Sequence, residues 1–201
     1  MKMRPICRIA ALLLAVGLAG CSEKKEEPAP SKAAPAPSKP AAKPVWQVRR
    51  EHAVSVCNLK QIGMAIWRYA DNNKGNFPPD LNTLFKKGYL ADPAVYITPA
   101  DPVSRPKARG ELRDENTSYV YVGKGLKNDC GQLPIAFEKV EIVNATGTCN
   151  FLYAAGNVWT CKMSAKKSNR EIAEELMRKT DPGREEIKQR ILDNAAAADA
   201  K

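Results

Sequence analysis

Cysteine is the residue type with the most chemistry to offer in this 201-residue chain, because a thiol can act as a nucleophile, a metal ligand, a lipid attachment point or half of a disulfide. The six cysteines are Cys7, Cys21, Cys57, Cys130, Cys149 and Cys161. None of them forms a C-x-x-C pair, so redox catalysis and a zinc site with the usual spacing are not expected. His52 is the one histidine of the chain, so neither a His-Asp-Ser catalytic triad nor a metal site with several histidine ligands is expected. We expect His52 to lie on the surface. We also expect that the protein is not an enzyme and that it binds neither a metal ion nor a cofactor.

Cys21 directly follows the small residues Ala19 and Gly20. Upstream lie three basic residues and an apolar run, residues 9–18, that is too short to span a bilayer. Together these features resemble the signal peptide and lipobox of bacterial lipoproteins. The resemblance implies cleavage before Cys21 and a palmitate-type lipid on its thiol. An ordinary signal peptide cut near Ala19 or Gly20 is the alternative.

The lipoprotein resemblance also predicts where the protein works. Ser22 stands where an aspartate would retain a lipoprotein in the inner membrane, so we expect the outer membrane, facing the periplasm. Removal of residues 1–20 takes away three basic and no acidic residues and lowers the formal charge from +10 to +7. Basic residues are mixed with acids, as at 49–51, and no basic stripe with exposed aromatics is present, so nucleic acid is not an expected partner. Anionic headgroups or envelope polymers fit this charge better than nucleic acid does, and the favoured explanation is a charged surface that keeps the domain soluble.

Four cysteines remain for disulfides in an oxidising compartment, and they allow three pairings. Residues 149–161 read as a β-hairpin with a three-residue loop, in which Gly156 takes the left-handed position. Counting outward from the loop places Cys149 opposite Cys161, and such a pair can form a cross-strand disulfide at a non-hydrogen-bonded position. Cys57 and Cys130 are the pair left by elimination, with two buried thiols as the alternative.

The remaining pattern predicts one folded domain behind a tether. Residues 22–44 consist of Glu, Lys, Ala and Ser with six prolines, a composition that cannot bury a core and favours an extended segment. An apolar stripe predicts a long helix over 47–73, and Asp80 is the expected cap of a short helix over 80–87. Runs at 118–122, 133–138 and 149–161 predict an antiparallel sheet. The expected fold class is α+β, with the long N-terminal helix packed on a small antiparallel β-sheet.

The end of the chain changes character after Ser164. Ser168 with Glu171 is a capping-box pattern, and Asp181-Pro182 is a strong start for a second helix. The apolar stripe of these two helices is thin, so we expect them to dock weakly. The expected organisation is therefore a signal peptide at 1–20, the lipidated cysteine and tether at 21–44, a domain at 45–164 and a helical tail at 165–201.

Other candidate site residues are acidic or aromatic. Scattered acids between the short helix and the sheet could contribute to a calcium site, but such loop acids are usually solvated. These are Asp92, Asp101, Asp114 and Glu115. Among the three tryptophans, Trp67 and Trp159 are expected at the core or its edge, and Trp46, next to the tether, is expected to be exposed.

Three segments carry a family resemblance: 57–66 (CNLKQIGMAI), 69–71 (YAD) and 75–79 (GNFPP). They resemble the prepilin-like domains related to type II secretion pseudopilins, which commonly have an N-L-K-Q-I-G helix and an F-P-P turn. Residues 97–101, 118–121 and 152–158 lie in the same order as that family's C-P-S-D, S-Y-x-Y and D-G-H-V motifs. The resemblance covers about residues 53–162 and implies a pilin-like version of the α+β fold.

The chain departs from that family in three ways. A lipid and a proline-rich tether replace the N-terminal membrane helix, so polymerisation through a helix bundle is not expected. Ala155 and Asn157 stand where the family often has Asp and His, which removes any role of those side chains. Thr98 replaces a frequent cysteine, so the family does not supply a partner for Cys57.

Taken together, the sequence predicts a non-catalytic, membrane-anchored lipoprotein that acts by protein–protein contact in the cell envelope. The resemblance implies a secretion or pilus-like system as the partner. A binding module for an envelope polymer or a small ligand is the alternative function. A hydrolase that uses carboxylates alone ranks last, because no acidic pair with useful spacing is present.

Overall fold

A computed structural model describes residues 43–103, 105–179 and 185–200. The signal peptide, Cys21, nearly all of the tether and the helix start at Asp181-Pro182 lie outside these residues. Within the described part, no helix combines the length and the apolar character needed to cross a bilayer.

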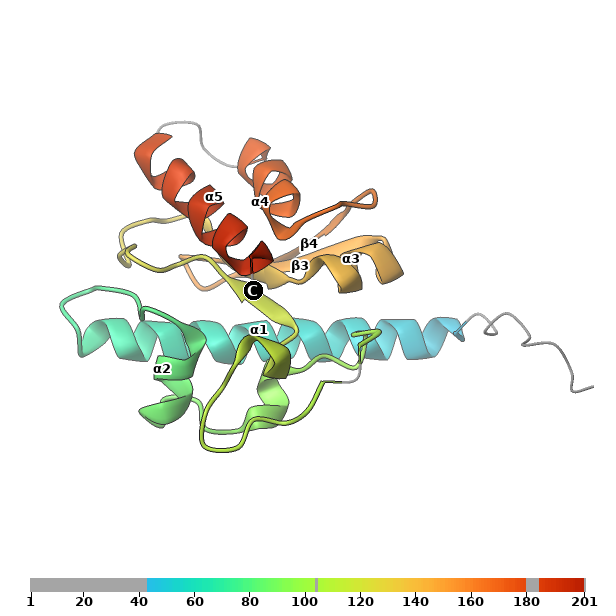
Figure 1. Cartoon of the computed structure of the whole chain (residues 1–201), viewed down its shortest axis with the longest axis horizontal. Helices are drawn as coiled ribbons and strands as arrows, with labels where there is room; N and C mark the ends of the chain where they lie inside the picture. Colours follow the sequence, from blue (N-terminus) through green and yellow to red (C-terminus); the bar gives the residue numbers. More distant parts are fainter. Residues whose placement is uncertain (1–42, 104, 180–184, 201) are drawn as a thin grey trace, which may run out of the picture. The chain divides into compact units, whose positions relative to one another are not determined.

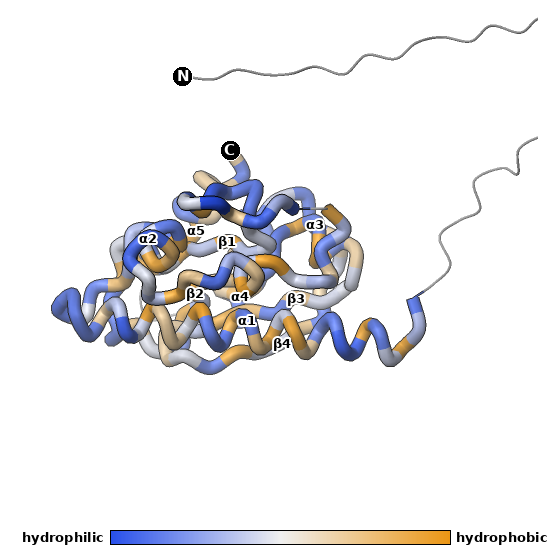
Figure 2. The backbone as a smooth tube through the Cα atoms, turned by 90° about the horizontal axis from the view of Figure 1, so that it is seen from below, coloured by the Kyte–Doolittle hydropathy of each residue, from blue (hydrophilic) through white to orange (hydrophobic). Residues whose placement is uncertain are grey.

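The long helix α1 spans Val45–Asp71 and confirms the predicted helix to within two residues at each end. Apolar and polar stretches alternate along it in Figure 2, and its stripe of Leu59, Ile62 and Ile66 is fully buried. Gly75 follows the helix with a φ of +78°, a left-handed conformation that glycine adopts without strain, and the chain then turns away. The helix therefore forms where the spacing of apolar residues predicts it.

Four strands form the antiparallel sheet, in the order β1-β2-β3-β4. They are β1 (Tyr119–Tyr121), β2 (Pro134–Glu138), β3 (Thr148–Tyr153) and β4 (Val158–Lys162). The predicted hairpin register is confirmed, since Cys149 pairs with Cys161 across β3 and β4. Gly156 in its turn has a φ of +89°. The coarse fold prediction, a long helix and a small antiparallel sheet in an α+β arrangement, is confirmed.

Helices cover both faces of the sheet (Figure 1). Helix α1 contacts β3 and β4 on one face, whereas α4 (Asn169–Arg178) and α5 (Glu185–Asp199) contact β2 and β1 on the other. The side chain of Ser168 accepts a hydrogen bond from the amide of Glu171, as the capping pattern predicts. Ile172, Leu176 and Ile191 are buried in the same core as the stripe of α1. The expectation of weak docking is therefore wrong, because both helices bury large apolar side chains in the core of the domain.

Short helices connect the main elements. Helix α2 (Leu81–Lys86) has Asp80 as its cap, as predicted, and two single-turn 3₁₀ helices follow, η1 (Pro93–Tyr96) and η2 (Asp114–Asn116). Helix α3 (Val140–Thr146) joins β2 to β3 and has no counterpart in the sequence prediction. It has only seven residues, too few for an apolar repeat to stand out.

The predicted disulfides are not formed: no two cysteines of the described residues lie at disulfide distance. Main-chain bonds from Tyr153 N to Asn157 O and from Met163 N to Gly147 O show which pairs of the hairpin are hydrogen-bonded. Because such pairs alternate along a ladder, Cys149 and Cys161 form a hydrogen-bonded pair, where the side chains are further apart than a disulfide requires.

The second predicted pair fails for a different reason. Cys57 is exposed on α1, whereas Cys130 is buried in the connection between β1 and β2. The alternative of two buried thiols therefore fits Cys130 but not Cys57.

Candidate binding site at the N-terminal end of the first helix

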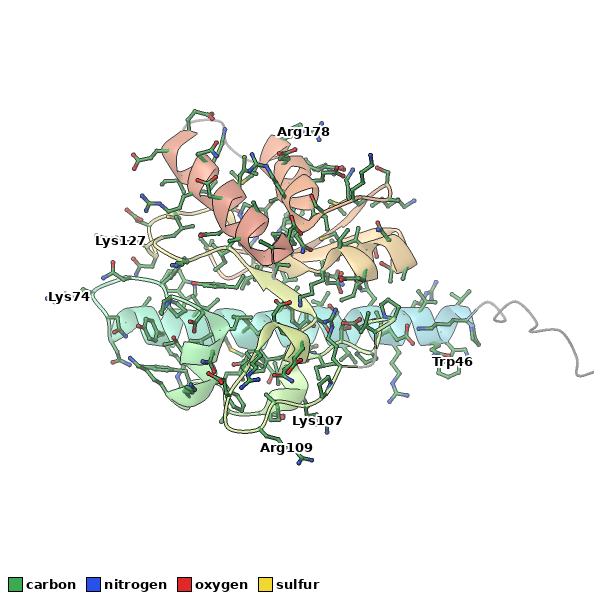
Figure 3. All side chains as sticks on the ribbon, viewed as in Figure 1. Trp46, Lys74, Lys107, Arg109, Lys127 and Arg178 are labelled. Atoms are coloured by element: carbon green, nitrogen blue, oxygen red, sulfur yellow. The ribbon has the colours of Figure 1, made fainter. Side chains whose placement is uncertain are left out.

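The first turns of α1 extend past the sheet (Figure 1), and none of the residues 45–50 is buried. Val45, Trp46 and Val48 expose apolar side chains there, and Trp46 is 65% exposed. Figure 3 shows Trp46 at this end of the helix. We call the exposed residues 45–50 the α1 N-terminal surface. The prediction that Trp46 is exposed is confirmed.

A cavity of about 420 Å³ opens beside this surface, where α1 passes over the end of the sheet. Its lining comes from α1, from the loop at Ala100, from the end of β2 and from the junction of α3 and β3. The residues are Val48, Arg49, Glu51, His52, Ala100, Glu138, Thr146, Thr148 and Asn150. Val48 and Arg49 line the cavity and also belong to the α1 N-terminal surface, whereas Trp46, two residues before Val48, lies on nearly the opposite side of the helix.

A buried carboxyl group lies at the inner side of this cavity. Glu138, which is 1% exposed, accepts hydrogen bonds from the Ser55 hydroxyl, the Asn150 amide side chain (3.0 Å) and the Asn150 main-chain N–H (2.8 Å). Burial raises the pKa of Glu138, and the donated hydrogen bonds from Ser55 and Asn150 act in the opposite direction. Glu138 thus joins α1 to β2 and β3 behind the cavity.

His52 continues this polar network toward the surface. A ring nitrogen of His52 lies 3.0 Å from the Thr160 hydroxyl, which in turn donates to the Asn150 side chain at 2.7 Å. His52 is partly exposed, so it is a surface residue with a partner on β4 and not merely a solvated one. The Ser55 hydroxyl bonds to Glu138 and Tyr119, and Ser55 is fully buried, so a substrate has no access to it. The arrangement provides no accessible pair of nucleophile and base around Ser55.

At the rim, an ion pair restrains the start of the helix. Lys43 Nζ lies 2.8 Å from Glu51 Oε2, and the side chain of Gln47 donates to Glu51 at 2.9 Å. Burial would raise the pKa of Glu51, but the bonds from Lys43 and Gln47 outweigh it and lower the pKa. The rim of the cavity therefore carries both a positive charge and a negative charge, and the α1 N-terminal surface lies next to it.

Three of the four acids considered for calcium, all but Glu115, bind partners within the protein. Asp92 caps the main chain at Ala94, and Asp101 bonds to Arg105 and Ser118. Asp114 forms an ion pair with Lys139 at 2.8 Å. In the residues covered by the structure, no group of three or more His, Cys, Asp or Glu side chains is placed to hold a metal.

The other two tryptophans differ from each other. Trp67 is partly buried and donates to the carbonyl of Ala154 at the hairpin turn, as expected for the core edge. Trp159 is 59% exposed on β4, so its prediction as a core or core-edge residue is wrong. Its strand lies at the edge of the sheet, where one face of the hairpin is only partly covered.

Sequence reasoning missed the buried network of Ser55, Glu138 and Asn150. A signal was present: Glu138 ends a strand whose other residues are all apolar, and such a carboxyl group has to be paired when it is buried. Strand periodicity alone does not say which polar residues meet across elements.

Comparison of the chain with protein-family models, with characterised proteins and with solved structures found no match. The pseudopilin and lipoprotein resemblances therefore rest on the sequence motifs, and they enter the function below only as parts of a proposal.

Proposed function

We propose that this chain is a lipid-anchored protein of the bacterial cell envelope, at the outer membrane and facing the periplasm, that acts by protein–protein contact and not by catalysis. The lipobox motif supports the anchor at Cys21, and the resemblance to pseudopilins supports a secretion or pilus-like assembly as the source of the partner. The contact surface is the α1 N-terminal surface with the adjoining cavity.

One observation carries the proposal. Six large apolar side chains are exposed in the described part of the chain, and three of them, Val45, Trp46 and Val48, fall within four residues. These side chains point to different sides of the first turns of α1, and their exposure to water is unfavourable, so this end of the helix is a surface that a partner would cover from more than one side. Tryptophan supplies much of the binding energy at many protein interfaces, and a neighbouring cavity can accept a side chain of the partner.

The charges around the cluster suit a specific contact. Arg49 and Arg50 are exposed beside Trp46 and Val48, and the Lys43–Glu51 ion pair lies at the rim. A polar and charged border around an apolar centre is the usual anatomy of an interface between proteins that also exist apart. Residues 22–44, if fully extended, would reach roughly 70 Å at about 3.1 Å per residue, so the surface need not lie at the membrane.

The experiment compares two exposed residues of the same helix. Trp46 (65% exposed) and Met64 (60% exposed) are 18 residues apart. That spacing is five helical turns, so both face the same side of α1, about 27 Å apart. We expect Trp46→Ser to abolish co-isolation of the partner from gently solubilised membranes and Met64→Ser to leave it unchanged. Equal recovery with both variants would refute the proposed surface.

A second candidate function rests on the cavity alone. Its volume of about 420 Å³ and its mixture of apolar and hydrogen-bonding residues would also suit a small ligand or the end of an envelope polymer. Binding of the purified protein to isolated cell-wall material, lost with Val48→Glu and weakened by salt, would favour this function over protein contact.

A further inference from the structure

The last strand of the sheet, β4, has an open edge. Among the described residues, the order β1-β2-β3-β4 gives β4 a single neighbour, β3, and Figure 1 shows this hairpin on the α1 side of α4. An edge strand presents unpaired main-chain N–H and C=O groups, which can pair with another strand. This edge is distinct from the α1 N-terminal surface.

The hydrogen-bond pattern of the hairpin shows which residues face outward. The pairs 153–157 and 147–163 are hydrogen-bonded, and alternation makes 151–159 and 149–161 hydrogen-bonded as well. The N–H and C=O groups of Trp159 and Cys161 therefore point to β3, and those of Val158, Thr160 and Lys162 point away from the sheet. Among the residues that the structure covers, no hydrogen bond to the main chain of these three is found.

The side chains leave this edge open to pairing. Natural edge strands are often blocked by proline, by a bulge or by several charged residues. β4 has no proline, the irregularity of the sheet lies between β2 and β3, and Lys162 is the one charged residue of the strand. Trp159 and Thr160 are exposed, so a second strand would also cover apolar surface.

The strand is complementary to itself in an antiparallel pairing centred on Thr160. We propose that the partner of this edge is a second copy of the chain, joined through β4 to form one continuous sheet of two protomers. Thr160 then pairs with Thr160 of the second copy, and Val158 pairs with Lys162 of the second copy at either end, each pair exchanging two hydrogen bonds.

Charge favours this occupant. In the symmetric register, each Lys162 lies opposite a valine, and the two ammonium groups stand four residues apart, about 13 Å along the strands. Paired threonines are favourable cross-strand neighbours, whereas like charges placed directly opposite one another are not. Trp159 lies opposite Cys161 of the second copy, and the large indole covers the smaller side chain.

Thr160→Pro and Thr160→Ala form a matched pair for the test. Both lose the hydroxyl that bonds to Asn150 and His52. Proline also removes the main-chain N–H of residue 160, which points away from β3 and forms no hydrogen bond with it. Proline is tolerated in an edge strand where the N–H would face solvent. In sedimentation and light scattering of residues 21–201 carrying Cys21→Ser, wild type and Thr160→Ala should be dimers. Thr160→Pro should be a monomer with at least tenfold weaker association.

A second measurement tests the register and does not depend on how well the proline variant folds. In the proposed dimer, residue 159 and Cys161 of the second copy form a non-hydrogen-bonded pair, the spacing that a disulfide needs. Trp159→Cys should therefore yield a covalent dimer on oxidation, joined between residues 159 and 161 in peptide mapping. A monomeric wild type, a Thr160→Pro variant as dimeric as Thr160→Ala, or a covalent dimer joined elsewhere would overturn the proposal.

Discussion

At the scale of single residues, Glu138 has an environment that controls how stability depends on pH. Its folded-state pKa is raised above the ordinary value of 4.5, so the folded state holds the proton more tightly than the unfolded state. The free energy of unfolding therefore falls as pH rises from about the unfolded pKa to the raised folded pKa. We expect the Glu138→Gln variant to lack this loss of stability with rising pH. In urea unfolding at a series of pH values, the wild type should therefore become less stable relative to the variant as the pH increases.

Glu51 provides the control of opposite sign. Its pKa is lowered by Lys43 and Gln47, so its stabilisation is present above the ordinary pKa and is lost as pH falls. Glu51→Gln should therefore cost more stability near neutral pH than in acid. The same sign of pH dependence for both variants would contradict the environments described for these two carboxyl groups.

The cysteines show what residue-level reasoning can reach. Counting from Gly156 predicts the register of Cys149 and Cys161 correctly, but it does not tell which pairs of the ladder are hydrogen-bonded. We expect Cys57, which is exposed, to be alkylated in the folded protein well before Cys149, which is fully buried and whose pKa is raised by burial. Time-resolved alkylation with peptide mapping would measure this order, and a Cys149–Cys161 disulfide in the native protein would contradict it.

At the scale of elements, the close approach of α1 to β3 depends on Gly63. A Cβ at this position would lie 2.9 Å from Leu152 Cδ1, inside van der Waals contact, and Leu152 is fully buried. Alanine favours a helix by about 1 kcal/mol over glycine, but overpacking a core costs about 1–3 kcal/mol. We expect Gly63→Ala to lower the free energy of unfolding by about 1 kcal/mol.

A double-mutant cycle tests the cause of that loss. Leu152→Val shortens the side chain that Gly63→Ala would touch, so in this background Gly63→Ala should be neutral or stabilising, with a coupling of about 1 kcal/mol. Additive effects of the two substitutions would show that a conflict with Leu152 is not the cause of the loss.

Elements with a repeating pattern could be predicted from sequence, and those held by tertiary contacts could not. The stripe of α1 and the alternation of the strands identify these elements closely. The sequence predicts weak docking of α5, and the closer docking in the structure adds polar contacts to the buried Ile191: the Asn194 side chain donates to the carbonyl of Val122 at 2.9 Å, and Asp199 accepts from the amide of Asn169 at 2.8 Å. Such partners are distant in sequence, so no local pattern reveals them.

At the scale of the whole molecule, the lipid anchor makes a separate prediction. If the thiol of Cys21 carries the lipid, Cys21→Ser should move the protein from the membrane fraction to the soluble fraction and abolish incorporation of labelled palmitate. Several acyl chains on one residue make release from a bilayer negligible, so the change should be nearly complete. Membrane association unchanged by Cys21→Ser would mean that the motif is incidental.

The candidate site can be predicted only in part from the sequence. The exposure of Trp46 follows from its place between a polar tether and the first buried turn of α1. The cavity near this end of α1 could not be predicted from the sequence, because residues from four separate parts of the chain, from Val48 to Asn150, line it. The sequence thus indicates one side of the site, and only the fold brings the other sides to it.

The most direct test of the proposed function is photo-crosslinking in living cells, with the photoreactive residue placed at position 46 or at position 64. The same helix face and similar exposure make Met64 the control for Trp46. We expect a single envelope protein, belonging to a secretion or pilus-like assembly, to be captured from position 46 and not from position 64. Capture of the same abundant lipoproteins from both positions, or of cell-wall material alone, would contradict a function through protein contact at this surface.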